Sequence, residues 1–173
     1  MDAADKLAEL TIPASFADAE LQWLDPLHLQ CRGVRLRLAR GFDLGEPTEG
    51  VVTLFKDQKF IRAYLKQLDG LRVDRMIEVG VWDGGSAIFF WNLFKPKMLS
   101  CIELKCQAPA LTDYIDAQSL SESFRVHFGV DQSDRAAVAA VAREDFPQGA
   151  VDLIIDDASH LYAPSRATFE VLF

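Results

Sequence analysis

The sequence predicts an α/β fold in which a mainly parallel sheet is covered by helices on both faces. Two observations lead to this prediction: short apolar runs alternate with helical patterns from residue 56 onward, and polar residues follow each run. Strands that alternate with helices at this spacing are typical of right-handed βαβ connections. We therefore expect parallel pairing, with both sheet faces buried, for most of the chain.

Composition limits the partners that such a fold would have. Half of the 173 residues are hydrophobic, which is enough for one domain with a small N-terminal appendage. The formal net charge is −8 and no lysine or arginine cluster offsets it, so nucleic-acid binding is not expected. Neither a membrane span nor the basic start of a signal peptide is present in the sequence. We expect a cytoplasmic protein with a small-molecule partner and no membrane contact.

Residues 1 to 50 are predicted to form an N-terminal extension that acts as a cap or an oligomer contact. Scattered leucines between residues 1 and 32, among them Leu7 and Leu10, predict one or two short helices. From Val34 to Arg40 apolar residues alternate with arginines, which predicts a strand with one apolar face that a partner strand or protomer covers. Its arginine face is interpreted as solvated.

Residues 51 to 173 are assigned to the main domain. Its first helix, at residues 56 to 69, has apolar residues at helical spacing and should lie against the sheet. Strands are predicted at residues 76 to 79, 98 to 104, 124 to 128 and 151 to 155, with further helices at residues 86 to 94, 109 to 118, 135 to 146 and 167 to 173.

A glycine-rich turn follows the first of these strands, in the run Glu78-Val-Gly-Val-Trp-Asp-Gly-Gly-Ser86. Gly80, Gly84 and Gly85 permit a tight turn and let a ligand approach the backbone where a Cβ would block it. Ser86 is expected to cap the next helix, whose N-terminus would then face the ligand. The turn is typical of a nucleotide site, although glycine turns also serve as plain connectors.

Polar residues also follow the other three strands, at the edge where open parallel sheets bind their ligands. The second strand leads to Glu103, which lies 25 positions after Glu78, close to the position of the ribose-binding acid in a dinucleotide fold. The third strand is followed by residues 131 to 134 and the fourth by residues 156 to 160, and both segments are acidic. Together these strand ends predict one binding site.

Two cofactors compete for this site. A nicotinamide cofactor would want glycines at positions 80, 82 and 85, and S-adenosylmethionine would want them at 80, 82 and 84, so Trp82 leaves each template with two of three. The acid at Glu78 and the acidic later strand ends favour S-adenosylmethionine, which carries an ammonium and a sulfonium and no phosphate. Glycine spacing alone leaves both cofactors open.

Three motifs in this order, residues 78 to 86, 129 to 134 and 155 to 160, resemble class I S-adenosylmethionine-dependent methyltransferases. The chain is most similar to the branch with the macrolide-sugar (macrocin and mycinamicin) O-methyltransferases and the cephalosporin hydroxylase-like proteins, over about residues 51 to 173. The resemblance implies a Rossmann-like domain. It also implies a cofactor site in which Glu78, Gly80 and Gly84 line the methionine end, Glu103 holds the ribose, and Asp131 and Gln132 lie near the adenine.

Ser86 and Asp156 complete the predicted cofactor set, although Asp156 is also interpreted as a partner of nearby backbone N–H groups. By the same resemblance Asp157 matches an acid that binds magnesium and His160 matches a general base; the roles of the two adjacent acids could be reversed. The family's further metal ligands, a Glu-Asp pair after the next strand, have no counterpart before Phe173. We therefore expect a domain truncated after its fourth strand.

The predicted function is O-methylation of a small-molecule hydroxyl, in a sugar or natural product, by in-line displacement at the sulfonium methyl. A cephalosporin hydroxylase-like activity and a non-catalytic module for cofactor binding or assembly are the alternatives, ahead of a nicotinamide oxidoreductase. A homo-oligomer is also expected, because an uncovered edge strand would expose apolar surface and unpaired backbone groups.

Overall fold

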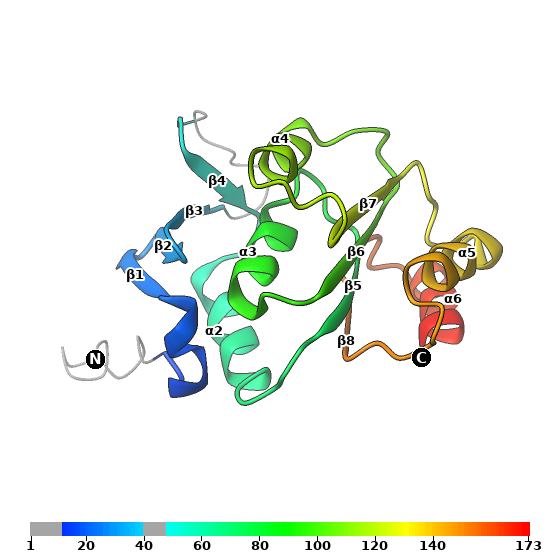
Figure 1. Ribbon diagram of the computed structural model, residues 1–173, viewed down its shortest axis with the longest axis horizontal. Coiled ribbons are helices and arrows are strands. Elements are labelled where there is room, and N and C mark those ends of the chain that lie inside the picture. The colour runs from blue at the N-terminus through cyan, green and yellow to red at the C-terminus, as the bar shows by residue number, and fades with distance from the viewer. Residues whose placement is uncertain (1–11, 40–47) are drawn as a thin grey trace. The chain divides into compact units, whose positions relative to one another are not determined.

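The computed structural model describes residues 12–39 and 48–173 (Figure 1). The chain divides into two compact units, residues 1–71 and 72–173, each with a four-stranded sheet. The predicted boundary at residue 50 is therefore displaced to Leu71. The reason is that strand β4 (Val51–Leu54) pairs with β3 (Val34–Leu38), which joins residues beyond 50 to the N-terminal sheet.

The N-terminal unit is built on a mixed sheet with the strand order β1-β2-β3-β4. The hairpin strands β1 (Gln22–Asp25) and β2 (His28–Cys31) are antiparallel, β3 is antiparallel to β2, and β4 is parallel to β3. A short 3-10 helix, η1 (Ala14–Ala19), precedes the sheet.

The prediction of short helices between residues 1 and 32 is wrong for the segments that form β1 and β2. In β2, Leu29 and Cys31 are buried while His28 and Gln30 are half-buried, which is the period of a strand rather than of a helix. The chain reverses before β2, where the backbone N–H of Leu27 donates to Asp25 Oδ1 at 2.7 Å. Leu7 and Leu10 lie outside the described residues.

Two other predicted elements of this unit are confirmed. Strand β3 alternates as expected, with Leu36 and Leu38 buried and Arg35 exposed. Helix α2 (Gln58–Gln67) begins after Asp57, whose carboxylate accepts a hydrogen bond from the backbone N–H of Phe60 at 3.0 Å. Helix α2 belongs to the N-terminal unit, and its packing against the parallel sheet stays a prediction.

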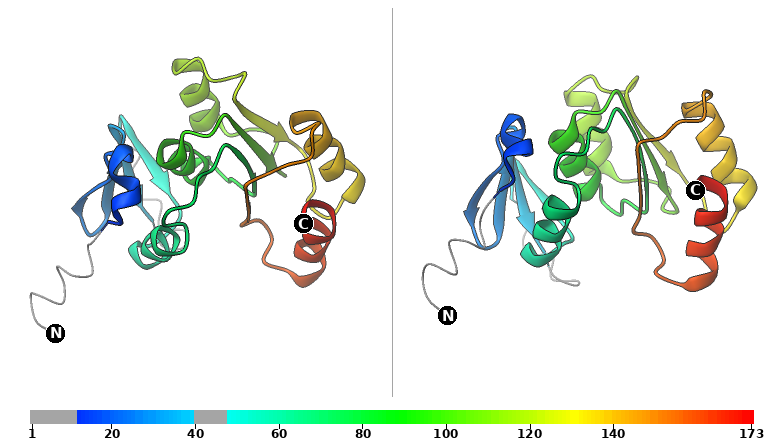
Figure 2. Two further views of the ribbon diagram at one scale, coloured as in Figure 1. Left: turned by 60° about the horizontal axis from the view of Figure 1, so that its bottom comes forward. Right: turned by 90° about the horizontal axis from the view of Figure 1, so that it is seen from below.

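The C-terminal unit has the predicted α/β architecture, a four-stranded, all-parallel sheet flanked by helices. Helices α3 and α4 lie on one face of this sheet and α5 and α6 on the other (Figure 2). The strands are β5 (Arg75–Val79), β6 (Met98–Glu103), β7 (Phe124–Phe128) and β8 (Leu153–Asp156), and the helices are α3 (Gly85–Phe94), α4 (Pro109–Ala117), α5 (Arg135–Asp145) and α6 (Tyr162–Leu172).

The strand order β7-β6-β5-β8 determines where a ligand would bind. Successive strands are added outward from β5 to β7, and the chain then returns to pair β8 with the other side of β5. The direction of winding thus reverses between β5 and β8, and in open sheets the ligand crevice lies beyond the carboxyl ends of the strands at this point.

Apolar side chains fill both sides of the sheet. On one side α3 buries nearly its whole surface, and the Trp91 ring stacks on Phe124 of β7 with centroids 5.2 Å apart. On the other side Val138 and Val141 of α5 pack in one cluster with Ile77 of β5. In the part of the chain that the structure describes, no helix is long and apolar enough to cross a membrane.

Candidate functional site

The turn between β5 and α3 has the predicted shape, but protein atoms fill the space that its glycines leave. Gly80 and Gly84 have φ values of +84° and +93°, which disfavour any residue with a side chain. A Cβ on Gly80 would lie 2.5 Å from the Cα of Ala158, and one on Gly84 would overlap the Leu111 side chain. These two glycines therefore allow close packing against the segment after β8 and against α4.

The predicted capping role of Ser86 is wrong. Helix α3 already begins at Gly85, and its N-cap is Gly84, which makes no side-chain capping bond. Because Gly84 takes a left-handed conformation, the chain turns into the helix before it reaches Ser86. Ser86 lies in the first turn of α3, beside the edge where the cofactor is expected.

Glu103, at the end of β6, joins two loops through its buried carboxylate. Its Oε2 accepts hydrogen bonds from the backbone N–H groups of Val81 and Trp82 at 2.9 and 2.7 Å, and its Oε1 accepts one from Lys105 at 2.8 Å. Such charge-assisted bonds hold the turn after β5 against the end of β6. A carboxylate offers about four acceptor positions, so roughly one remains for a ligand.

The Lys105 side chain crosses back over the same turn. Its Nζ lies 2.5 Å from Asp83 Oδ1 and 4.6 Å from the centroid of the Trp82 ring. Trp82 has φ +55°, a left-handed conformation that is unusual for a bulky residue, and about half of the residue is exposed. This contact gives the Trp82 ring a role in closing the loop after β5.

Glu78 is fully buried in β5, the strand at the centre of the winding reversal. It pairs in register with Cys101 of β6 and Ile155 of β8. Burial raises the pKa of the Cys101 thiol well above its ordinary value, and the charge of Glu78 adds to the shift. Burying a carboxylate carries a desolvation cost, so a buried Glu78 two residues before Gly80 of the glycine turn is consistent with a ligand site.

Gln132, expected near the adenine, is a buried link between three segments. Its Nε2 donates to Asp156 Oδ1 at 3.1 Å and to Thr168 Oγ1 at 3.0 Å, and its Oε1 accepts from the backbone N–H of Ser159 at 2.9 Å. The amide thereby joins the loop after β7 to the end of β8 and to α6. A ligand contact by this side chain would have to share or replace these bonds.

The two other acids after β7 accept hydrogen bonds from residues close to them in the sequence. Asp131 is exposed, and its Oδ1 accepts hydrogen bonds from the hydroxyl and the backbone N–H of Ser133, which lower the pKa of Asp131. Asp134 caps α5 by accepting from the backbone N–H groups of Ala136 and Ala137 at 3.0 and 3.1 Å. Asp134 is therefore the N-cap of α5.

Asp156, Asp157 and His160 come together after β8. The backbone N–H of Asp157 donates to the carbonyl of Val79 at 2.8 Å, which holds the acid beside β5. Its Oδ1 lies 4.0 Å from His160 Nε2, and the His160 side chain is 74% exposed, so the ring can meet a molecule from solvent. Asp156 accepts from the backbone N–H of Ala158 at 3.3 Å, which agrees with its structural interpretation. It is nevertheless more exposed than Asp157, so exposure does not single out Asp157 as the outward acid.

Metal binding stays a prediction. Over residues 12–39 and 48–173, no three His, Cys, Asp or Glu side chains converge in a way that could hold a metal ion. Asp157 thus offers one carboxylate, whereas magnesium usually takes one or two carboxylates together with water and substrate oxygens.

One buried charged cluster was missed by the sequence analysis. Asp145, the last residue of α5, accepts hydrogen bonds from Arg125 Nη1 at 2.9 Å and His127 Nε2 at 2.7 Å. Burial alone would raise the pKa of Asp145, but its polar neighbours Ser100, His127 and Arg125 lower it overall. The period of two in β7 could have placed Arg125 and His127 on one face, but no local pattern links them to Asp145.

Comparison with protein-family models found no match, and comparison with curated proteins found none either. The case for a function therefore rests on the three sequence motifs and on the geometry of the carboxyl edge.

Proposed function

We propose that the C-terminal unit binds S-adenosylmethionine at the carboxyl edge of its sheet and methylates a hydroxyl group of a small molecule. The observation that carries this proposal is the position of Glu103. Its carboxylate ends the strand next to β5 and is hydrogen-bonded to the glycine turn, within a sheet whose winding reverses between β5 and β8. This is where a doubly wound sheet binds the ribose of a nucleotide cofactor.

The charges of this edge favour S-adenosylmethionine over a nicotinamide dinucleotide. Glu78, Glu103, Asp156 and Asp157 supply four carboxylates around the ends of β5, β6 and β8. They would attract the ammonium and sulfonium of S-adenosylmethionine and repel a pyrophosphate. The nearby cation of Lys105 is already paired with Asp83.

When bound, S-adenosylmethionine supplies an electrophilic methyl group. The chain would have to orient the acceptor hydroxyl and remove its proton, and an imidazole is suited to that step near neutral pH. His160 Nε2 would take this proton, and Asp157 would stabilise the protonated ring at a distance that is now 4.0 Å. Asp157 could instead hold magnesium beside the hydroxyl. Both assignments and the predicted homo-oligomer stay proposals.

A non-catalytic binding or assembly module is the second candidate. It is favoured because protein groups already occupy the carboxyl edge. Glu103 and Gln132 are hydrogen-bonded to loop backbone, and Ala158 and Leu111 fill the space beside the glycines. Such an edge can be explained by stability alone. The cephalosporin hydroxylase-like alternative has no observation of its own in the structure.

Calorimetry with S-adenosylhomocysteine, its 2′-deoxy analogue and NAD tests the proposal. Because Glu103 also holds the turn, weaker binding by Glu103→Ala alone would not identify a ribose contact. A cycle of two ligands and two proteins separates the effects. We expect removal of the 2′-hydroxyl to weaken binding to the parent by about tenfold, as for one hydrogen bond to a charged group, and binding to Glu103→Ala by less than about twofold.

The exposed acid Glu122 provides a matched control, since Glu122→Ala makes the same charge change in the loop before β7. This variant should bind both ligands as the parent does. Preference for NAD, or no binding of S-adenosylhomocysteine, would refute the proposed cofactor. A 2′-hydroxyl effect as large in Glu103→Ala as in the parent, or one lost equally in Glu122→Ala, would refute the ribose role of Glu103.

A further inference from the structure

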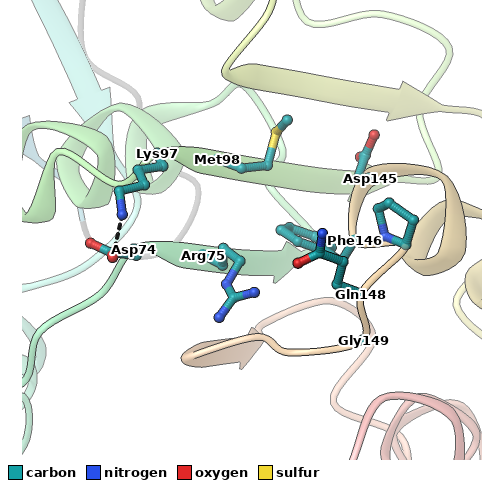
Figure 3. Close-up of a pocket in the computed structure, with 9 residues that line it drawn as sticks. Asp74, Arg75, Lys97, Met98, Asp145, Phe146, Gln148 and Gly149 are labelled. Carbon is teal, nitrogen blue, oxygen red and sulfur yellow. Dashed lines mark hydrogen bonds and ion pairs between the residues drawn. The ribbon is translucent and has the colours of Figure 1, made fainter.

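A cavity of about 500 Å³ lies at the amino-terminal edge of the parallel sheet. Arg75 and Met98, the first residues of β5 and β6, line it together with Phe146 and Gln148 from the segment after α5 (Figure 3). Glu103 ends β6 at the opposite edge, so the cavity is separate from the residues proposed to bind the cofactor. Its volume is within the range of about 300 to 1,000 Å³ that is usual for small-molecule sites.

The carboxylates of Asp74, Asp145 and Asp152 already have partners at this edge. Asp74 pairs with Lys97, whose Nζ is 2.8 Å from Oδ2, as the dashed line in Figure 3 indicates. Asp152 Oδ2 accepts hydrogen bonds from the backbone N–H groups of Asp74 and Arg75 at 2.9 and 2.7 Å. Asp145 belongs to the buried cluster with β7 described above.

The guanidinium of Arg75 differs from these paired groups. Among the residues that the structure describes, it has no ion pair within 4.0 Å and no side-chain hydrogen bond. Figure 3 shows the side chain extending away from the Asp74 and Lys97 pair. A guanidinium presents a planar fork of N–H donors that matches a carboxylate in two parallel hydrogen bonds.

We propose that this cavity binds a small organic carboxylate. The anionic group pairs with Arg75, the side-chain amide of Gln148 offers two further N–H donors, and a compact apolar body packs against Met98 and Phe146. The site is independent of the proposed methyltransferase activity.

A singly charged carboxylate fits the electrostatics better than phosphate does. One guanidinium balances one negative charge, whereas a phosphate dianion would meet the nearby carboxylates with its second charge unpaired. Helix α5 also ends at Asp145 with Phe146 as its C-cap, so the negative end of the helix dipole opposes any anion. We therefore expect weak binding, with a dissociation constant on the order of 1 mM.

Benzoate is a suitable probe, with benzyl alcohol as its neutral counterpart and inorganic phosphate as a second anion. Each is titrated into isotope-labelled protein at constant ionic strength, and the amide signals of Phe146 and Gln148 are followed by NMR. Benzoate should shift these signals saturably. Benzyl alcohol and phosphate should bind at least about tenfold more weakly.

Substitutions identify the group that binds the anion. Arg75→Gln should weaken benzoate binding by about tenfold or more, and Arg75→Lys by a smaller factor, because lysine keeps the charge but loses the fork. Arg72→Gln is the matched control: its side chain is 86% exposed, and binding should stay within about twofold of the parent. Amide spectra of each variant establish that it is folded.

Three outcomes would overturn the proposal. These are the absence of saturable shifts at Phe146 and Gln148 up to about 20 mM benzoate, equal binding by folded Arg75→Gln, and tighter binding of phosphate than of benzoate. None of them depends on whether S-adenosylmethionine binds at the other edge.

Discussion

The two edges of the parallel sheet use buried polar groups in different ways. At the carboxyl edge Glu103 and Gln132 bond mainly to backbone N–H groups and to other neutral or acidic partners, and so hold loops in place. At the amino edge Asp145 is bonded by the side chains of Arg125 and His127, which holds the end of α5 against β7. The first arrangement shapes loops, and the second joins a helix to a strand.

Substitutions at the two edges should therefore affect different properties of the C-terminal unit: ligand binding at the carboxyl edge and stability at the amino edge. A ligand at the carboxyl edge must fit around loops whose conformation depends on Glu103, so binding and loop geometry are coupled there. The ion cluster at the amino edge should affect unfolding and its pH dependence, with little influence on a cofactor at the other edge. Substitutions at each edge test that separation.

The largest loss of stability is expected from Gly80→Ala. The new Cβ would meet the backbone of Ala158 at 2.5 Å, and φ at Gly80 is +84°, so steric overlap adds to backbone strain. We expect the free energy of unfolding, measured in urea, to fall by about 3 kcal/mol. Gly129→Ala is the control, because Gly129 has φ +70° but no atom lies within 4 Å of the position that its new Cβ would take. It should lose only about 1 kcal/mol; equal losses would show that overlap with Ala158 is unimportant.

Asp145→Asn should have the next largest effect. The substitution removes the charge that faces Arg125 and His127, while the Asp145 side chain itself is fully buried. Breaking a buried pair costs about 3 to 5 kcal/mol, but Arg125 is partly exposed, so we expect about 2 kcal/mol in urea unfolding. Asp116→Asn, an exposed change on α4, should leave stability within about 0.5 kcal/mol. S-adenosylhomocysteine affinity should not change, and a large loss of affinity would break the separation of the two edges.

The contribution of Asp145 should also depend on pH. Because its hydrogen bonds hold its pKa below the ordinary value, the ionised carboxylate stabilises the folded chain. This stabilisation is fully present above the unfolded pKa of about 3.9 and is lost as pH falls through the lower folded pKa. The difference in unfolding free energy between the parent and Asp145→Asn should therefore shrink below about pH 4. A difference that stays constant or grows as the solution is acidified would contradict this role.

A smaller effect is expected at the helix starts of the carboxyl edge. Asp134→Ala removes an acceptor of two backbone hydrogen bonds and should cost about 1 kcal/mol in thermal or urea unfolding. Ser86→Ala should cost less than about 0.3 kcal/mol, because Gly84 and not Ser86 is the N-cap of α3. The reverse order of the two losses would mean that Ser86 stabilises its helix after all.

The sequence predicted the parallel sheet well because its strands are short apolar runs separated by helical crossovers, a local pattern with few alternatives. It failed for β1 and β2 because these strands have only four residues each, and their leucines fit a helical period as well as a strand period. Strands β3 and β4 are separated in sequence by the segment 40–47, and no local pattern predicts that they pair. Their pairing joins residues beyond 50 to the N-terminal unit, which therefore ends at Leu71.

The residues of the candidate site were predictable by type and position, but not by their contacts. Strand ends identified Glu103, Gln132 and Asp157 as neighbours of one edge. Their partners are backbone N–H groups and side chains far away in the sequence, such as Thr168 for Gln132, which only the folded chain brings together. The same holds for Asp145 and His127, which lie 18 residues apart.

An NMR titration with S-adenosylhomocysteine shows whether a nucleoside cofactor binds at the carboxyl edge. Saturable shifts should gather at the backbone amides of Val81, Trp82 and Lys105, which donate to Glu103, while the amides of Phe146 and Gln148 at the other edge stay unchanged. The absence of saturable shifts, or shifts confined to Phe146 and Gln148, would contradict binding at the carboxyl edge.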